Sequence, residues 1–174
     1  MRISDETAAR AIDFLRENDI ATPKDLRRKV YEMQDQLDDM RRSIKYIDRR
    51  VDTLEEHIRQ GEIYLQHREL YEQYQQQKPR KQAVFYEAHR AELMLFGTAK
   101  GYLDACLNGH ALPLESWKKE REKLTVEKAE FSLEYTVLKE QVLDVENVQR
   151  AVERILHEAK QPQKDRQENM REQS

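Results

Sequence analysis

The side chains that most often carry chemistry are few in this sequence, and they stand apart from one another. The chain has 174 residues, with five histidines and one cysteine. These residues are His57, His67, His89, His110, His157 and Cys106. No two histidines are four residues apart or form an H-x-H pair, so the spacing predicts no metal site. We therefore expect no metal and no cofactor.

Other catalytic patterns are also missing from the sequence. It contains no P-loop, no G-x-G-x-x-G and no G-x-S-x-G. Carboxylates are plentiful, but they are interspersed with Lys and Arg, as in surface pairs of long helices. Cys106 falls on the apolar face of a predicted helix, and we expect it to be packed rather than nucleophilic. The sequence thus favours a binding or scaffolding protein over an enzyme.

Composition favours long helices and disfavours a sheet. Hydrophobic residues make up 38% and charged residues 37% of the chain, with only four glycines and four prolines. Turn signals are therefore scarce, and the composition is typical of coiled coils. The N-terminus has no apolar signal core, and no stretch approaches the roughly 18–20 apolar residues of a membrane span. We expect no membrane insertion, and a single cysteine is consistent with the cytoplasm.

Local signals predict an all-α, elongated antiparallel coiled-coil or three-helix arrangement. A short N-terminal helix is expected within residues 1–19. Thr22, Pro23 and Asp25 then form a strong helix start. Long helices are expected at about 23–77, 81–107 and 114–158, within a bundle at 20–160, and a disordered tail is expected at 161–174.

The long first rod carries a heptad seam. Its apolar residues alternate in steps of four and three, which keeps one stripe facing a partner helix. The stripe consists of Leu26, Val30, Met33, Leu37, Met40, Ile44, Ile47, Val51 and Leu54, and it continues to Ile58. β-branched residues dominate one set of positions, which favours a parallel pair of chains. Packing of the same stripe inside one chain is the alternative.

The lengths of the predicted helices bear on that alternative. The helix at 81–107 is about half as long as its neighbours and would pack beside Tyr64 to Tyr74. The stripe from Leu26 to about Val51 would then lack partners within the chain. Exposed apolar stripes of this length mark interfaces. We therefore expect a homodimer or a partner helix at the seam.

A basic stretch on the same helix suggests a second kind of partner. It consists of Arg41, Arg42, Lys45, Arg49 and Arg50. Arg42, Lys45 and Arg49 share one helical face, and a row of this kind can contact DNA phosphates. Nearby acids, Asp38 among them, equally allow a solvated coiled-coil flank. Smaller clusters occur at 78–81 and 118–123.

Two segments, residues 71–109 and 112–156, resemble the C-terminal, non-catalytic region of relaxase/mobilisation proteins. These proteins are carried by conjugative transposons and mobilisable elements of bacteria. The resemblance extends over about residues 4–156. It is most specific in the stretch Y-E-A-H-R-A-E-L that begins at Tyr86, in Tyr102-Leu103 and in Trp117-Lys118.

The resemblance implies a role in a relaxosome, the complex that prepares DNA for conjugative transfer. The nicking activity of the family lies in a separate N-terminal domain with a tyrosine nucleophile and a histidine cluster, and this chain carries no such cluster. The family therefore implies docking to relaxosome proteins or to the coupling protein of the secretion channel. Contact with transfer-origin DNA is the alternative, and a generic coiled-coil scaffold is a third.

Overall fold

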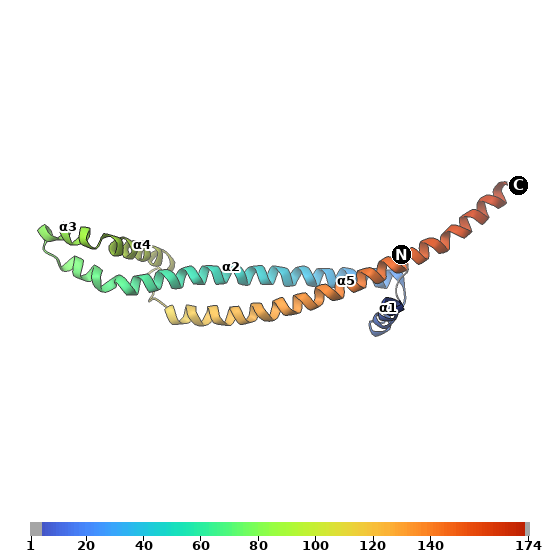
Figure 1. Cartoon of the computed structure of the whole chain (residues 1–174), viewed down its shortest axis with the longest axis horizontal. Coiled ribbons are helices and arrows are strands. Elements are labelled where there is room, and N and C mark those ends of the chain that lie inside the picture. Colours follow the sequence, from blue (N-terminus) through green and yellow to red (C-terminus); the bar gives the residue numbers. More distant parts are fainter. Residues whose placement is uncertain (1–4, 173–174) are drawn as a thin grey trace. The chain divides into compact units, whose positions relative to one another are not determined.

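The chain folds entirely into helices and turns over the residues that the structure describes. The computed structural model describes residues 5–172, and this part contains no strand. The helices are α1 (Asp5–Glu17), α2 (Pro23–Gln76), α3 (Pro79–Ala88), α4 (Arg90–Leu107) and α5 (Leu114–Glu172), as Figure 1 shows. The expected all-α fold is confirmed.

Local capping signals explain where α2 begins and where α4 ends. The Thr22 hydroxyl accepts a hydrogen bond from the Asp25 backbone N–H at 3.2 Å and donates one to the Asp25 carboxylate at 2.9 Å. This reciprocal pair satisfies part of the open first turn of α2. At the end of α4, Asn108 and Gly109 have φ angles of 47° and 85°. Left-handed residues at this point end the helix and reverse the chain.

The helices differ from the prediction in two places. The expected helix at 81–107 is interrupted at His89, whose ψ of 27° separates α3 from α4. No glycine or proline marks this interruption in the sequence. The last helix extends to Glu172, so the segment expected to be a disordered tail is helical up to that residue. Most residues of this segment are Gln, Glu, Lys or Arg, which are good helix formers, and they favour a helix in spite of Pro162.

The chain divides into two compact units, and α2 and α5 each contribute to both. The first unit combines residues 1–43 with residues 131–174. In it α2 and α5 run antiparallel, since Gln34 bonds to Glu146 at 2.7 Å and Arg41 bonds to Tyr135 at 3.0 Å. The core of this unit consists of Leu26, Val30, Met33, Val142, Val145 and Val148. Helix α1 belongs to this unit, because Ala11, Phe14 and Leu15 pack against that core.

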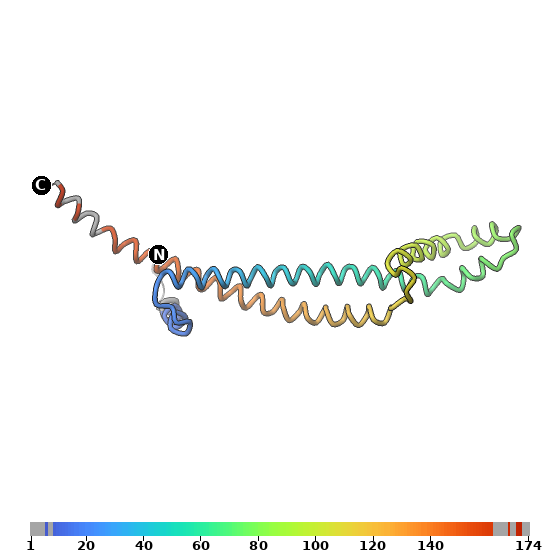
Figure 2. The backbone as a smooth tube through the Cα atoms, turned by 180° about the vertical axis from the view of Figure 1, so that it is seen from behind, coloured from blue at the N-terminus to red at the C-terminus, as the bar shows by residue number. Residues whose placement is uncertain are grey.

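The second unit is the continuous segment 44–130. Its core consists of Leu54, Ile58, Leu103 and Trp117, which come from α2, α4 and α5. Here too α2 and α5 are antiparallel, because Glu62 pairs with Lys118 and Asp48 pairs with Lys128. Helix α4 lies beside the C-terminal half of α2 (Figure 2), where the Phe96 ring stacks on Tyr64 and Tyr71 at centroid distances of 5.1 and 4.5 Å. The expected position of the middle helix, beside Tyr64 to Tyr74, agrees with these contacts.

Gly61 explains why the heptad seam stops at this point of α2. A Cβ atom at Gly61 would lie 3.1 Å from Leu114 Cδ1 and 3.3 Å from Leu112 Cδ1. The missing side chain therefore leaves room for the segment that leads from α4 into α5. The irregularity in the sequence pattern corresponds to a packing site rather than to a break in the helix.

Candidate functional site

The nine residues of the predicted interface lie along the side of α2 that other helices of the same chain cover. Leu26, Val30, Met33, Ile47 and Leu54 are buried. The remaining four, Leu37, Met40, Ile44 and Val51, are half-buried. In the first unit α5 provides the cover through Val142, Val145 and Val148.

The expectation that this stripe lacks partners within the chain is therefore wrong. That expectation considers only the short middle helix as a packing partner of the stripe. Helix α5 is also long enough to pack along α2. The seam is intramolecular and antiparallel, which corrects the predicted parallel pair. Each large apolar side chain buried in it contributes roughly 1.5–3 kcal/mol to folding.

The structure pairs three of the five predicted phosphate contacts with groups of the same chain. Arg41 pairs with Asp38 at 3.2 Å, and Arg42 pairs with Asp39 at 3.4 Å. Arg50 donates two hydrogen bonds to Glu120, at 2.7 and 3.0 Å. These bonds raise the pKa of Arg50 and lower the pKa of the Glu120 carboxyl. Lys45 and Arg49 are exposed, so two cations of this stretch remain for a partner.

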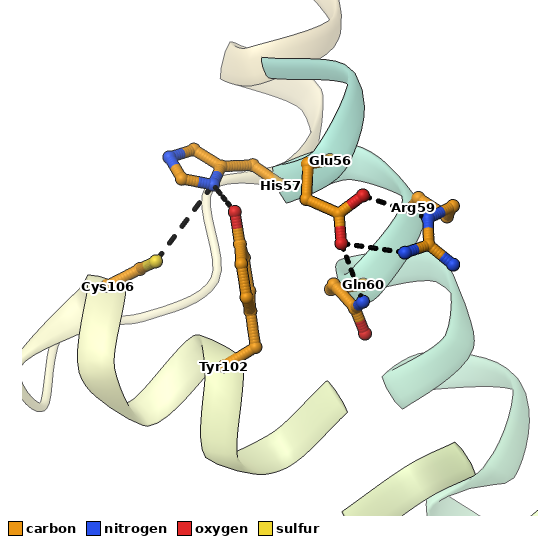
Figure 3. Close-up of polar contacts among 6 residues, drawn as sticks. All are labelled: Glu56, His57, Arg59, Gln60, Tyr102 and Cys106. Atoms are coloured by element: carbon orange, nitrogen blue, oxygen red, sulfur yellow. Dashed lines mark hydrogen bonds and ion pairs between the residues drawn. The ribbon is translucent and has the colours of Figure 1, made fainter. Parts of the chain in front are cut away.

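A cluster of reactive side chains joins three helices of the second unit. The Nδ1 atom of His57 on α2 lies 2.7 Å from the Tyr102 hydroxyl on α4 and 4.0 Å from Cys106 Sγ (Figure 3). The His57 ring also packs on Trp117 of α5, with a centroid distance of 4.8 Å. Next to it, Glu56 accepts hydrogen bonds from Arg59 and from Gln60.

Burial controls the charge of this cluster. Desolvation lowers the pKa of His57, and the positive charge of Arg50 lowers it further. The ring is therefore held in its neutral form. Desolvation also raises the pKa of Tyr102, so its hydroxyl keeps its proton. A neutral ring with its proton on Nε2 accepts a hydrogen bond from that hydroxyl at Nδ1.

This geometry favours a structural role for the cluster. The nitrogen nearest to the Cys106 thiol is the one that Tyr102 engages at a much shorter distance. Over the described residues, no group of three or more His, Cys, Asp or Glu side chains could hold a metal ion. The polar contacts of the cluster thus connect α2 with α4, and ring packing on Trp117 adds α5.

Cys106 itself departs from the expectation. It is exposed rather than packed. Helix α4 buries Leu93, Phe96, Ala99 and Leu103, and Cys106 lies at the edge of the face that they form. The sequence pattern predicts a broader apolar face than the one that α4 buries. Periodicity alone does not show how far a neighbouring helix extends over that face. The spacing of four between Tyr102 and Cys106 is the one signal that places them together.

The outer face of α4 carries no charge over about three turns. Met94, Thr98, Gly101 and Ala105 follow one another at spacings of four, three and four, so they share one face. Gly97 lies beside them, and all five residues are exposed. A Cβ atom at Gly97 or Gly101 would meet nothing within 4 Å. Among the described residues, no packing contact therefore requires glycine at these two positions.

Comparison with known proteins gives no relative for this chain: no family model, no curated protein and no solved structure matches it. None of the helices in the described residues has the length and apolar character needed to cross a membrane.

Proposed function

We propose that this chain is a non-catalytic helical module of a bacterial DNA-mobilisation relaxase, and that it binds a partner helix through the outer face of α4. The partner would be a relaxosome protein or the coupling protein of the secretion channel. The family part of this proposal rests on the resemblance of residues 71–109 and 112–156 to relaxase C-terminal regions. The location of the interface rests on the structure.

The uncharged outer face of α4 is the observation that carries the proposal. In a chain with 37% charged residues, an exposed helical face without charge is unusual. Met94 is 53% exposed there. Glycine in the middle of an exposed helix costs about 1 kcal/mol relative to alanine. Gly97 and Gly101 incur this cost without any packing gain inside the chain, and they would let the backbone of a second helix approach closely.

The basic stretch at 41–50 supports the alternative, a DNA-binding arm, less well. Three of its five cations are already paired with Asp38, Asp39 and Glu120. A phosphate that binds there would have to compete with these carboxylates. The predicted homodimer through the seam is not retained, because α5 and α4 cover the seam.

Binding of the purified chain to the purified coupling protein and accessory proteins of one mobile element tests the proposal. Gly101→Glu places a charge in the centre of the face and should weaken binding at least about tenfold, as loss of an interface hot spot does. Ala129→Glu adds the same charge at an exposed position of α5, outside this face, and is the matched control. Equal affinities of the two variants would show that this face is not the interface. No binding of the unchanged chain to any of these proteins would refute the proposed function.

A further inference from the structure

We propose that the turn between α2 and α3, with the first turn of α3, binds the phosphate backbone of a nucleic acid. We call residues 73–86 the basic tip. This inference is independent of the proposed partner of α4, because different residues carry it. It also differs from the DNA contact predicted at residues 41–50.

The charge of the basic tip is exceptional within this chain. Residues 73–86 form the longest stretch of the sequence without Asp or Glu, although the chain has 34 acidic residues. The same stretch contains Lys78, Arg80 and Lys81. The acids that flank it are already engaged, since Glu72 pairs with Arg68 at 3.6 Å and Glu87 pairs with Arg90 at 3.9 Å. No carboxylate of the tip itself offsets its positive charge.

All three cations of the tip are exposed, and no ion pair or side-chain hydrogen bond engages them among the described residues. This distinguishes the tip from residues 41–50, where carboxylates of the same chain bind three of the five cations. A cation without an internal partner gives up no protein contact when it binds a phosphate. The tip is therefore the better site for an anionic partner, even though it has fewer cations.

The backbone of α3 adds a further attraction for anions. Helix α3 begins at Pro79, and Lys78 at its N-cap makes no side-chain capping bond. The N–H groups of Lys81 and Gln82 bond to the Lys78 carbonyl, whereas no backbone bond engages the N–H of Arg80. An open helix N-terminus carries partial positive charge and binds phosphate groups. It adds to the charge of the three exposed side chains.

Aromatic contacts hold the tip in a defined geometry. Tyr74 near the end of α2 lies 6.4 Å from Phe85 and 5.8 Å from Tyr86 of α3, measured between ring centroids. These rings pack the second half of α3 against the last turn of α2, and α3 is short enough for this contact to order its first turn as well. The three cations therefore project from an ordered turn, which lowers the entropic cost of binding.

The uncharged side chains of the tip favour a nucleic acid over an anionic membrane. Five of them are glutamines, namely Gln73, Gln75, Gln76, Gln77 and Gln82. Amides form hydrogen bonds with phosphate and sugar oxygens. Val84, with 73% of its surface exposed, is the one large aliphatic side chain of the tip. Membrane binding would require a larger apolar anchor.

Fluorescence anisotropy with labelled 20-nucleotide single strands and duplexes tests the proposal over a series of salt concentrations. The test variant is Lys78→Gln, Arg80→Gln, Lys81→Gln. The control variant is Arg42→Gln, Lys45→Gln, Arg49→Gln, which removes the same charge from the other basic stretch. For duplex DNA, loss of three phosphate contacts should reduce the slope of log K against log salt by about 2.7. The control should keep the affinity and the slope of the unchanged chain.

Three results would overturn the proposal. The test variant could bind like the unchanged chain, or the control could lose the affinity instead. The unchanged chain could also bind neither the single strand nor the duplex, whether or not it binds vesicles that contain about 30% phosphatidylserine. Circular dichroism of both variants should show the helix content of the unchanged chain, since all six substituted side chains are exposed. A negative result in this nucleic-acid experiment would not contradict the proposed protein interface on α4. The Gly101→Glu experiment tests that interface separately, with a protein partner and a different surface.

Discussion

At the scale of single residues, His57 is an ionisable group held by side chains of two other helices of the second unit. Its ring lies between the Tyr102 hydroxyl and the Trp117 ring. The charged groups that act on it are Arg50 and Glu56 of α2 and Glu120 of α5, while Tyr102 and Cys106 of α4 are the neutral groups beside it. Burial and Arg50 lower its pKa, and the two carboxylates oppose this effect only in part.

This lowered pKa predicts a loss of stability at mildly acidic pH. The unfolded chain binds a proton at His57 near pH 6.5, whereas the folded chain binds it only at lower pH. The contribution of neutral His57 is therefore fully present above about pH 6.5 and is lost as the pH falls from there through the lower folded value. We expect the unfolding midpoint to drop by about 2–4 °C for each 1 kcal/mol lost.

Thermal unfolding followed by circular dichroism between about pH 8 and pH 5 measures this effect, because this window includes the ordinary pKa of histidine. In His57→Gln the midpoint should depend less on pH than in the unchanged chain. His110→Gln removes an exposed histidine and serves as the control. Identical pH dependence in His57→Gln and the unchanged chain would contradict the assignment.

At the scale of elements, α2 packs its heptad seam against other helices of the chain, so the seam contributes to the stability of the fold. Ile47 is 4% exposed, whereas its neighbour Tyr46 is 70% exposed. A charge introduced at Ile47 would lie in the covered stripe. The same charge at Tyr46 would lie in solvent.

Ile47→Glu should therefore destabilise the chain by about 3–5 kcal/mol, because it removes apolar packing and buries a carboxylate. Tyr46→Glu should change the free energy of unfolding by no more than about 0.5 kcal/mol. Urea denaturation followed by circular dichroism gives both values. A halved mass of Ile47→Glu in light scattering, with unchanged stability, would instead support an intermolecular seam.

At the scale of the whole molecule, the two units differ in how the sequence forms them. The second unit is one continuous segment, whereas the first draws on both ends of the chain. Helix α5 continues beyond the packed part of the first unit. From Glu153 to Glu172, all side chains that the structure describes are exposed, including Ile155 and Met170. A helical segment whose described side chains are all exposed gains little from packing and is marginally stable in water.

Hydrogen exchange followed by mass spectrometry should show this difference within one helix. Amides at 157–172 should be protected roughly 100-fold less than amides at 138–150, where Val142, Val145 and Val148 are buried. Equal protection of the two segments would mean that a second molecule covers the end of α5. Dilution of the sample would then lower the protection of residues 157–172 alone.

Much of the fold follows from signals that are local in the sequence. Thr22, Pro23 and Asp25 predict the start of α2, and Asn108-Gly109 predicts the reversal after α4. From Leu26 onward the apolar residues are spaced alternately by four and three residues, which predicts a helix with one buried face. Each of these signals depends on residues within one or two turns of one another, so the sequence alone determines them.

Tertiary structure decided what covers each face. Periodicity shows that a stripe is apolar, but it does not show which helix packs on it. The cover of the seam by α5, the exposure of Cys106 and the contact of His57 with Tyr102 all depend on pairing between segments far apart in the chain. The same holds for charge, since Glu120 neutralises Arg50, whereas no described residue pairs with the cations of the basic tip. Pairing of distant segments depends on length, register and side-chain volume together, which no local pattern contains.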